Sequence, residues 1–173
     1  QVNKANIPDG FAESGKIVES AGGKLGVWMS PSETYAFVID YDWAKNNGYS
    51  LVSWGVDSRK LSGAPFPALS LADPKYRSEA RKNLAQLIKR ARLAHIKYDG
   101  FIAVEDPAHH DLLPGEDSVE PLAEYSLELI KASKEANPQL VAEPTYLNSY
   151  ANYISPWIIK YADFVWGNSG GDC

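Results

Sequence analysis

A single aspartate, Asp99, stands at the end of an otherwise apolar run in the stretch HIKYDGFIAV, residues 95–104. Because burying an unpaired carboxylate is costly, a charge at this point indicates the open end of a buried strand, where a carboxylate can act as a nucleophile. Lys97 lies two residues earlier, so strand alternation places it on the same side as Asp99. There it favours the ionised carboxylate and offers donors to hydroxyl groups. The alternative interpretation is an aspartate that caps a turn at Gly100, with Lys97 as its ordinary ion partner.

Other apolar runs also end in residues suited to chemistry. These residues are Trp28, Glu143, Trp166 and Asp172. The two tryptophans suit the walls of a sugar-binding site, or alternatively the packing of a core. Glu143 is the best alternative catalytic carboxylate. A hydrolase could use Glu143 together with Asp99 or Glu105, which we call the rival mechanism. For Asp172 the alternative is a solvated residue near the end of the chain.

The elements that must position these residues alternate between strands and helices. The sequence predicts strands at 24–31, 96–104, 139–144 and 162–172, and helices at 9–24, 69–94, 119–136 and 146–161. The clearest helix has Asp73 as its N-cap and Pro74 at its first helical position. Residues 35–67 form an irregular, aromatic excursion, with one or two helical turns around Trp43.

This alternation predicts an α/β fold of parallel β/α units joined by right-handed crossovers. In such folds the loops at the carboxyl ends of the strands build the active site. No glycine-rich nucleotide-binding element occurs in the sequence, which favours a (β/α)₈ TIM barrel over a doubly wound sheet. Such a barrel takes roughly 250 residues. We therefore expect residues 1–173 to be a partial barrel domain, a central segment of about four β/α units, with the rest of the barrel and any flanking domains outside this chain.

Composition argues against several classes of partner. The 17 Lys and Arg residues are spread along a chain of net charge -5, so no nucleic-acid partner is expected. No apolar run approaches the roughly 20 residues needed to cross a bilayer, and the first residues lack the pattern of a signal peptide. We therefore expect no membrane association, while the cellular location stays open, with secretion or a periplasmic location compatible with the sequence.

Metal and cofactor chemistry is not expected either. Cys173 is the single cysteine, which excludes an intrachain disulfide and a cysteine cluster. The pair His109 and His110 lies among acidic residues, but it lacks the H-x-H or H-x-x-x-H spacing of a metal site. A solvated acidic loop is the preferred interpretation. A serine hydrolase is disfavoured because no G-x-S-x-G element is present.

Three stretches carry a family likeness: GGKLGVWMSP, LSLADPKYRSEARKNLAQLIKRARLAHIKYDG and SPWIIKYADFVWGNSGGD. Together they resemble the middle of the catalytic barrel of α-galactosidase-like glycoside hydrolases, the melibiase group. The third barrel strand of that group carries a G-(I/L/V)-W-x-x-P element, to which residues 26–31 are similar. Its fourth strand carries a K-(W/Y)-D element, and Lys97-Tyr98-Asp99 matches it position by position. The family commonly has an asparagine two residues after the aspartate, where this chain has Phe101.

The resemblance implies a retaining glycoside hydrolase that cleaves an α-linked sugar of an oligosaccharide or other glycoside. It implies Asp99 as the nucleophile of a covalent glycosyl-enzyme intermediate and Asp172 as the acid/base residue. A retaining mechanism requires the two carboxyl groups to lie about 5–5.5 Å apart. The resemblance also implies a sugar subsite, which we expect to be lined by Lys97, Trp28, Trp166 and Glu143. The alternative from another class is a non-catalytic barrel that binds carbohydrate or serves a structural role.

Overall fold

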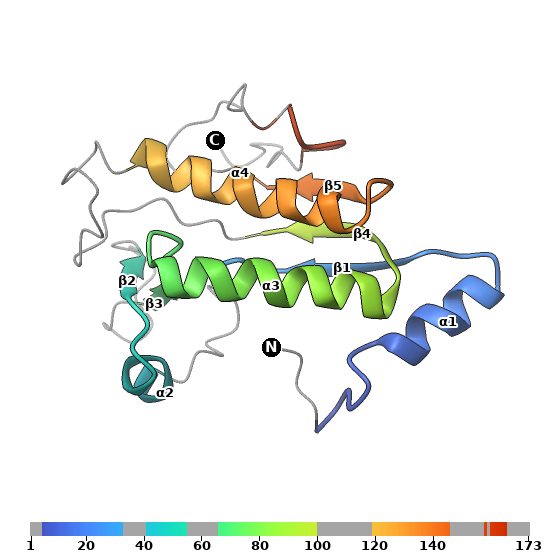
Figure 1. Ribbon diagram of the computed structural model, residues 1–173, viewed down its shortest axis with the longest axis horizontal. Helices are drawn as coiled ribbons and strands as arrows, with labels where there is room; N and C mark the ends of the chain where they lie inside the picture. The colour runs from blue at the N-terminus through green and yellow to red at the C-terminus, as the bar shows by residue number, and fades with distance from the viewer. Residues whose placement is uncertain are drawn as a thin grey trace, which may run out of the picture.

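A computed structural model describes residues 5–32, 41–54, 66–99, 119–145, 158 and 160–165. Its centre is a parallel sheet with the strand order β1-β4-β5. The strands are β1 (Leu25–Met29), β4 (Leu93–Tyr98) and β5 (Val141–Pro144). Two long helices, α3 (Pro74–Ala91) and α4 (Val119–Ala136), lie side by side over one face of this sheet (Figure 1). The predicted parallel α/β arrangement is therefore confirmed for the described residues.

Helix α3 begins and ends at the signals that its sequence carries. The Asp73 carboxylate accepts the backbone N–H of Lys75 at 2.8 Å and that of Tyr76 at 3.3 Å, and Pro74 follows it at the first helical position. The helix ends at Ala91 rather than at residue 94, because Arg92 adopts a left-handed conformation (φ 53°) and Leu93 already belongs to β4. Helix α4 has the predicted bounds, 119–136.

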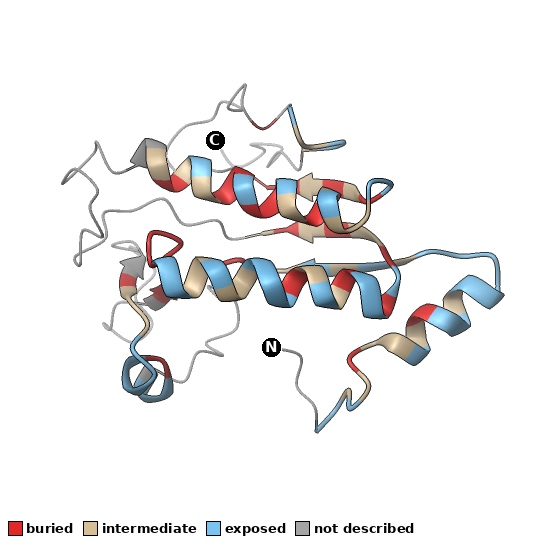
Figure 2. Ribbon diagram, viewed as in Figure 1, coloured by how far each residue is buried: buried red, intermediate tan, exposed pale blue. Residues whose placement is uncertain are grey.

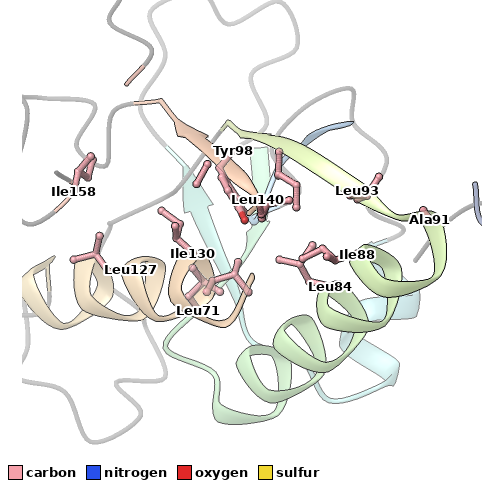
Figure 3. Packing of buried hydrophobic residues seen from close by; sticks show 13 residues of the cluster. Leu71, Leu84, Ile88, Ala91, Leu93, Tyr98, Leu127, Ile130, Leu140 and Ile158 are labelled. Atoms are coloured by element: carbon pink, nitrogen blue, oxygen red, sulfur yellow. The ribbon is translucent and has the colours of Figure 1, made fainter. Parts of the chain in front are cut away.

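The core lies between the sheet and the two long helices. Helices α3 and α4 and strands β4 and β5 each contribute buried residues, red in Figure 2. Strand β1 contributes the partly buried side chains of Leu25, Val27 and Met29. Figure 3 shows the buried side chains close together between helices and sheet; they include Leu84, Ile88, Leu93, Tyr98, Ile130 and Leu140. Burial raises the pKa of the Tyr98 phenol well above its usual value. One face of β4, marked by Ile96 and Tyr98, is therefore committed to the core.

The first helix, α1 (Ala12–Ser20), packs near the amino ends of the strands, against α3 and β1. The approach to α3 is close because Gly15 has no side chain: a Cβ there would lie 2.1 Å from the carbonyl oxygen of Ala91. The predicted helix at 9–24 is thus confirmed in a shorter form.

The excursion between β1 and α3 contains structure that the sequence analysis did not predict. Besides the expected short helix α2 (Tyr41–Asn46), it holds an antiparallel pair of strands, β2 (Leu51–Trp54) and β3 (Phe66–Leu69). The strands are short and β3 contains Pro67, a residue that normally argues against a strand. The N–H of Leu69 donates to the carbonyl of Ser32 at 3.0 Å, which places the pair near the carboxyl end of β1.

Side-chain contacts fix the excursion on α3. The Tyr49 hydroxyl donates to Glu79 at 2.6 Å, and the Lys75 ammonium lies 4.6 Å from the centroid of the Tyr49 ring. The hydrogen bond with Glu79, together with burial, raises the pKa of Tyr49 to about 12. The Trp43 ring lies beside Tyr49, with centroids 5.6 Å apart.

Three sequence-based predictions need correction or fall partly outside the described residues. Strand β4 begins at Leu93 rather than at residue 96, and Asp99 directly follows its last residue; residues 100–104 are not described. Of the strand predicted at 162–172, residues 162–165 are described and do not form a strand, because the Asp163 side chain, rather than a backbone carbonyl, accepts the N–H of Ala142 at 2.7 Å; residues 166–172 lie outside the described residues. Of the helix predicted at 146–161, only residues 158, 160 and 161 are described, and Ile158 is helical.

Candidate functional site

The carboxyl ends of the three parallel strands meet at one edge of the sheet. Met29, Tyr98 and Pro144 lie opposite one another as the last residues of β1, β4 and β5. The N–H of Asp99 donates to the Met29 carbonyl at 2.9 Å, and the N–H of Thr145 donates to the Tyr98 carbonyl at 2.8 Å. Asp99 and Thr145 are therefore held by the sheet ladder just beyond the strands, where the sequence analysis expected functional residues.

The two faces of this sheet differ in character. Ile96, Tyr98 and Ala142 are buried on the face toward the helices. The side chains that alternate with them carry polar groups, and we call their side the polar face, made of Trp28, His95, Lys97, Asp99, Glu143 and Thr145. Trp28, Lys97 and Glu143 form one row across it, since each is the register partner of the next. The sheet thus brings together four of the six residues that the sequence analysis proposed for the site.

Asp99 has a side-chain hydrogen-bond partner on the neighbouring strand. The Thr145 hydroxyl lies 3.0 Å from Asp99 Oδ1 and 3.1 Å from the Tyr98 carbonyl oxygen. Thr145 is only 8% exposed, while Asp99 is partly exposed. The carboxylate is thus anchored on one side by a buried hydroxyl.

Lys97 and Trp28 contact each other in the row that lies two residues before Asp99 along β4. The Lys97 ammonium lies 4.7 Å from the centroid of the Trp28 ring, a distance typical of a cation–π interaction. Trp28 is 63% exposed, so it is not part of the core that the described residues form. An exposed indole beside an ammonium group offers both an apolar surface and hydrogen-bond donors.

Glu143 is paired with a residue that the sequence analysis did not single out. Its Oε2 lies 2.8 Å from Nε2 of His95, on the adjacent strand. Gly26 makes room for this imidazole, since a Cβ at Gly26 would lie 3.1 Å from His95 Nδ1. The sequence analysis missed both His95 and Thr145. Strand alternation could have found them, because His95 lies two residues before Lys97 and Thr145 lies two residues after Glu143.

The remaining candidates lie outside the described residues. They are Asp172 and Trp166 of the proposed site, Glu105 of the rival mechanism, and the pair His109 and His110. Within the part of the chain that the structure describes, no group of three or more His, Cys, Asp or Glu side chains is arranged to hold a metal ion. None of the helices described here is both long and apolar enough to span a membrane.

Comparison with known proteins gives a likeness of fold. No family model matches the sequence. No curated protein matches it either. Among solved structures, the α-galactosidase from Lactobacillus brevis matches 99% of this chain with 22% of its own, at 20% identity and a TM-score of 0.63. The GH36 α-galactosidase AgaA from Geobacillus stearothermophilus matches 99% of this chain with 23% of its own, at 16% identity and a TM-score of 0.63.

A third match comes from another glycoside hydrolase. The glycoside hydrolase domain of PelA from Pseudomonas aeruginosa covers 89% of this chain and 54% of its own length, at 15% identity and a TM-score of 0.58. Doubly substituted variants of AgaA have also been solved in complex with stachyose and with raffinose. This chain spans less than a quarter of the length of the two α-galactosidases. The resemblance to α-galactosidases is thus confirmed at the level of the fold, which this chain shares with part of these glycoside hydrolases.

Proposed function

We propose that this chain is a central segment, residues 1–173, of the (β/α)₈ catalytic barrel of a retaining glycoside hydrolase that cleaves an α-linked sugar. The three adjacent parallel strands with helices on one face are what successive units of such a barrel require. The likeness to α-galactosidases along 99% of the chain supports the same architecture. The substrate is expected to be a galactoside or a related hexoside.

The observation that carries the proposal is the placement of Asp99. Its carboxylate follows the last residue of β4, at the edge where the carboxyl ends of β1, β4 and β5 meet. It extends the polar face that presents Lys97 and Trp28, and its Oδ1 is held by a hydroxyl at 3.0 Å. A partly exposed carboxylate with a fixed orientation at this edge is suited to attack a sugar bound above the strands.

The chemistry follows the two-step scheme of retaining enzymes. In the first step an oxygen of Asp99 forms a bond to the anomeric carbon, the bond to the leaving oxygen breaks, and that oxygen takes a proton from the acid residue, for which we propose Asp172. In the second step the deprotonated Asp172 takes a proton from water, and the resulting hydroxyl attacks the anomeric carbon. Asp99 leaves as a carboxylate, and the sugar is released with its original configuration.

The rest of the polar face would bind the sugar. The Lys97 ammonium would donate hydrogen bonds to sugar hydroxyls, since the Cα atom of Lys97 lies roughly 7 Å along the strand from that of Asp99. The exposed Trp28 ring would supply an apolar wall, with Trp166 as a second wall. Glu143 would border the same subsite from the row of Lys97.

The test uses the complete protein that contains this sequence. Purified wild type is assayed on a panel of aryl α-glycosides, beside Asp99→Asn and the matched control Asp42→Asn, which makes the same change at an exposed position of α2. We expect turnover of at least one substrate by wild type and by Asp42→Asn, and none by a folded Asp99→Asn. Near-normal activity of Asp99→Asn would refute the proposal. Binding of a glycoside without turnover by wild type would favour the non-catalytic carbohydrate-binding barrel instead.

A further inference from the structure

We infer that Thr145 is a positioning residue that fixes the orientation of the Asp99 carboxylate; this inference rests on the proposed function. Thr145 directly follows β5 and Asp99 directly follows β4, so the contact joins the ends of two neighbouring strands. The Thr145 hydroxyl lies 3.0 Å from Asp99 Oδ1. This hydroxyl is a side-chain donor on the proposed nucleophile.

The hydroxyl has two acceptors within reach but a single proton to donate. The carbonyl oxygen of Tyr98, at 3.1 Å from the hydroxyl, already accepts the backbone N–H of Thr145 at 2.8 Å. A carboxylate is the stronger acceptor, because hydrogen bonds to ionised groups are roughly twice as strong as neutral ones. The hydroxyl proton therefore belongs on Asp99 whenever Asp99 is ionised, which is the state in which it attacks.

The donor itself is held rigidly. Its backbone is tied to β4 by the N–H bond to Tyr98, and its side chain is 8% exposed. Threonine is also stiff at χ1 because it is branched at Cβ. A donor fixed in this way restricts rotation of the carboxylate about the Cβ–Cγ bond. Without such a donor the χ2 torsion angle of an aspartate has a broad distribution.

With the Thr145 hydroxyl on Oδ1, Oδ2 is the oxygen that we assign to the bond with the anomeric carbon. When Oδ2 becomes an ester oxygen, Oδ1 becomes a neutral carbonyl and a weaker acceptor. The hydroxyl proton can then turn to the Tyr98 carbonyl, 3.1 Å away, without movement of the backbone. Thr145 thus orients the nucleophile before attack and remains satisfied in the covalent intermediate.

The test compares Thr145→Val, Thr145→Ser, Thr145→Ala and wild type in the complete protein. Valine keeps the shape of threonine and removes the donor, whereas serine and alanine differ from each other only by the hydroxyl. We expect kcat to fall about 10- to 100-fold in Thr145→Val, the range that a hydrogen bond to a charged group spans. KM should change by less than about threefold, and Thr145→Ser should recover most of kcat.

A second readout isolates the attack itself. A fluorinated α-glycosyl fluoride traps the covalent intermediate, and its rate of attachment is followed by intact mass. Attachment should slow in Thr145→Val and in Thr145→Ala but not in Thr145→Ser; if the valine variant does not fold, the serine and alanine pair decides. Attachment to Asp99 at equal rates with and without the hydroxyl would overturn the role of Thr145 and leave the proposed function intact. Failure of every such probe to label wild type, with no turnover of any glycoside, would overturn the proposed function itself.

Discussion

Glu143 and His95 face each other across β4 and β5, with Oε2 of the carboxylate 2.8 Å from Nε2 of the imidazole. Glu143 lies opposite Lys97 in the register of the two strands, whereas His95 lies opposite Val141, two residues further from the carboxyl edge. The Glu143 carboxylate is thus engaged on the side away from Asp99. This arrangement favours a supporting role for Glu143 over the role of second catalytic carboxylate.

The first prediction concerns this pair. Glu143→Gln keeps an acceptor for His95 and removes the charge, so we expect kcat to fall by less than about tenfold, below the 10²- to 10⁴-fold contribution of a general acid or base. Steady-state kinetics of Glu143→Gln beside Asp99→Asn measure the contrast. A loss in Glu143→Gln as complete as in Asp99→Asn would support the rival mechanism that pairs these two carboxylates.

The second prediction concerns the exposed indole on the polar face. Since Trp28 is 63% exposed, Trp28→Ala should change the free energy of unfolding by about 1 kcal/mol or less, while raising KM at least about tenfold through the loss of a stacking surface. Trp43→Ala is the matched control, because Trp43 is a similarly exposed tryptophan on α2 (49%). If both variants raise KM equally, Trp28 has no special place in sugar binding.

Local signals in the sequence were sufficient to predict the long helices and the parallel strands. Asp73-Pro74 marks the start of α3. Strand alternation from Asp99 to Lys97 also places the two on one side. These signals are local because caps, breakers and side-chain periodicity act within a few residues.

The remaining features depend on contacts between distant segments. The β2–β3 pair joins strands that residues 55–65 separate in the sequence, and the N–H of Ser50, just before β2, donates to the Asp73 carboxylate. No local pattern in the sequence reveals either contact. The Thr145–Asp99 contact likewise depends on the register of β5 against β4, and the His95–Glu143 contact on the space left by Gly26. At 162–165 an apolar pattern suggested a strand, but the Asp163 carboxylate occupies the edge of β5.

The third prediction concerns Asp73, which caps α3 and also accepts the N–H of Ser50 at 2.8 Å. Because Asp73 is buried and satisfies backbone donors of two segments, Asp73→Ala should lower the free energy of unfolding by about 2 kcal/mol or slightly more. Asp73→Ser, which retains a capping oxygen, should lose less. Urea unfolding measures both, with Asp42→Ala as the exposed control. Equal losses in the alanine and serine variants would contradict a capping role.

The fourth prediction is a pH dependence that involves Asp163. Burial by itself raises the pKa of Asp163, but hydrogen bonds from the Lys134 ammonium and the Ala142 N–H outweigh it, so that the pKa lies below its usual value. A carboxyl whose pKa is lower in the folded state stabilises the protein above its unfolded pKa, about 3.9, and loses this contribution as the pH falls through the folded pKa.

Asp163→Asn should therefore be less stable than wild type at pH 7, with the difference shrinking below about pH 4. The Asp163 side chain is 40% exposed, so solvent screening limits the difference to about 1 kcal/mol or less. Urea unfolding at pH 7, 5 and 3 measures it. If the difference in free energy of unfolding between wild type and Asp163→Asn stays constant from pH 7 to pH 3, the ionised carboxylate of Asp163 does not stabilise the protein.

Asp99 is the proposed nucleophile, and peptide mapping of the trapped intermediate identifies the residue that carries the glycosyl group. The complete protein is incubated with a fluorinated α-glycosyl fluoride, digested at acidic pH and sequenced by tandem mass spectrometry. We expect the glycosyl group to be attached to Asp99, and Asp99→Asn to take up no label. Attachment to Glu143 or to any other residue, with Asp99 unmodified, would contradict the assignment of Asp99 as the nucleophile.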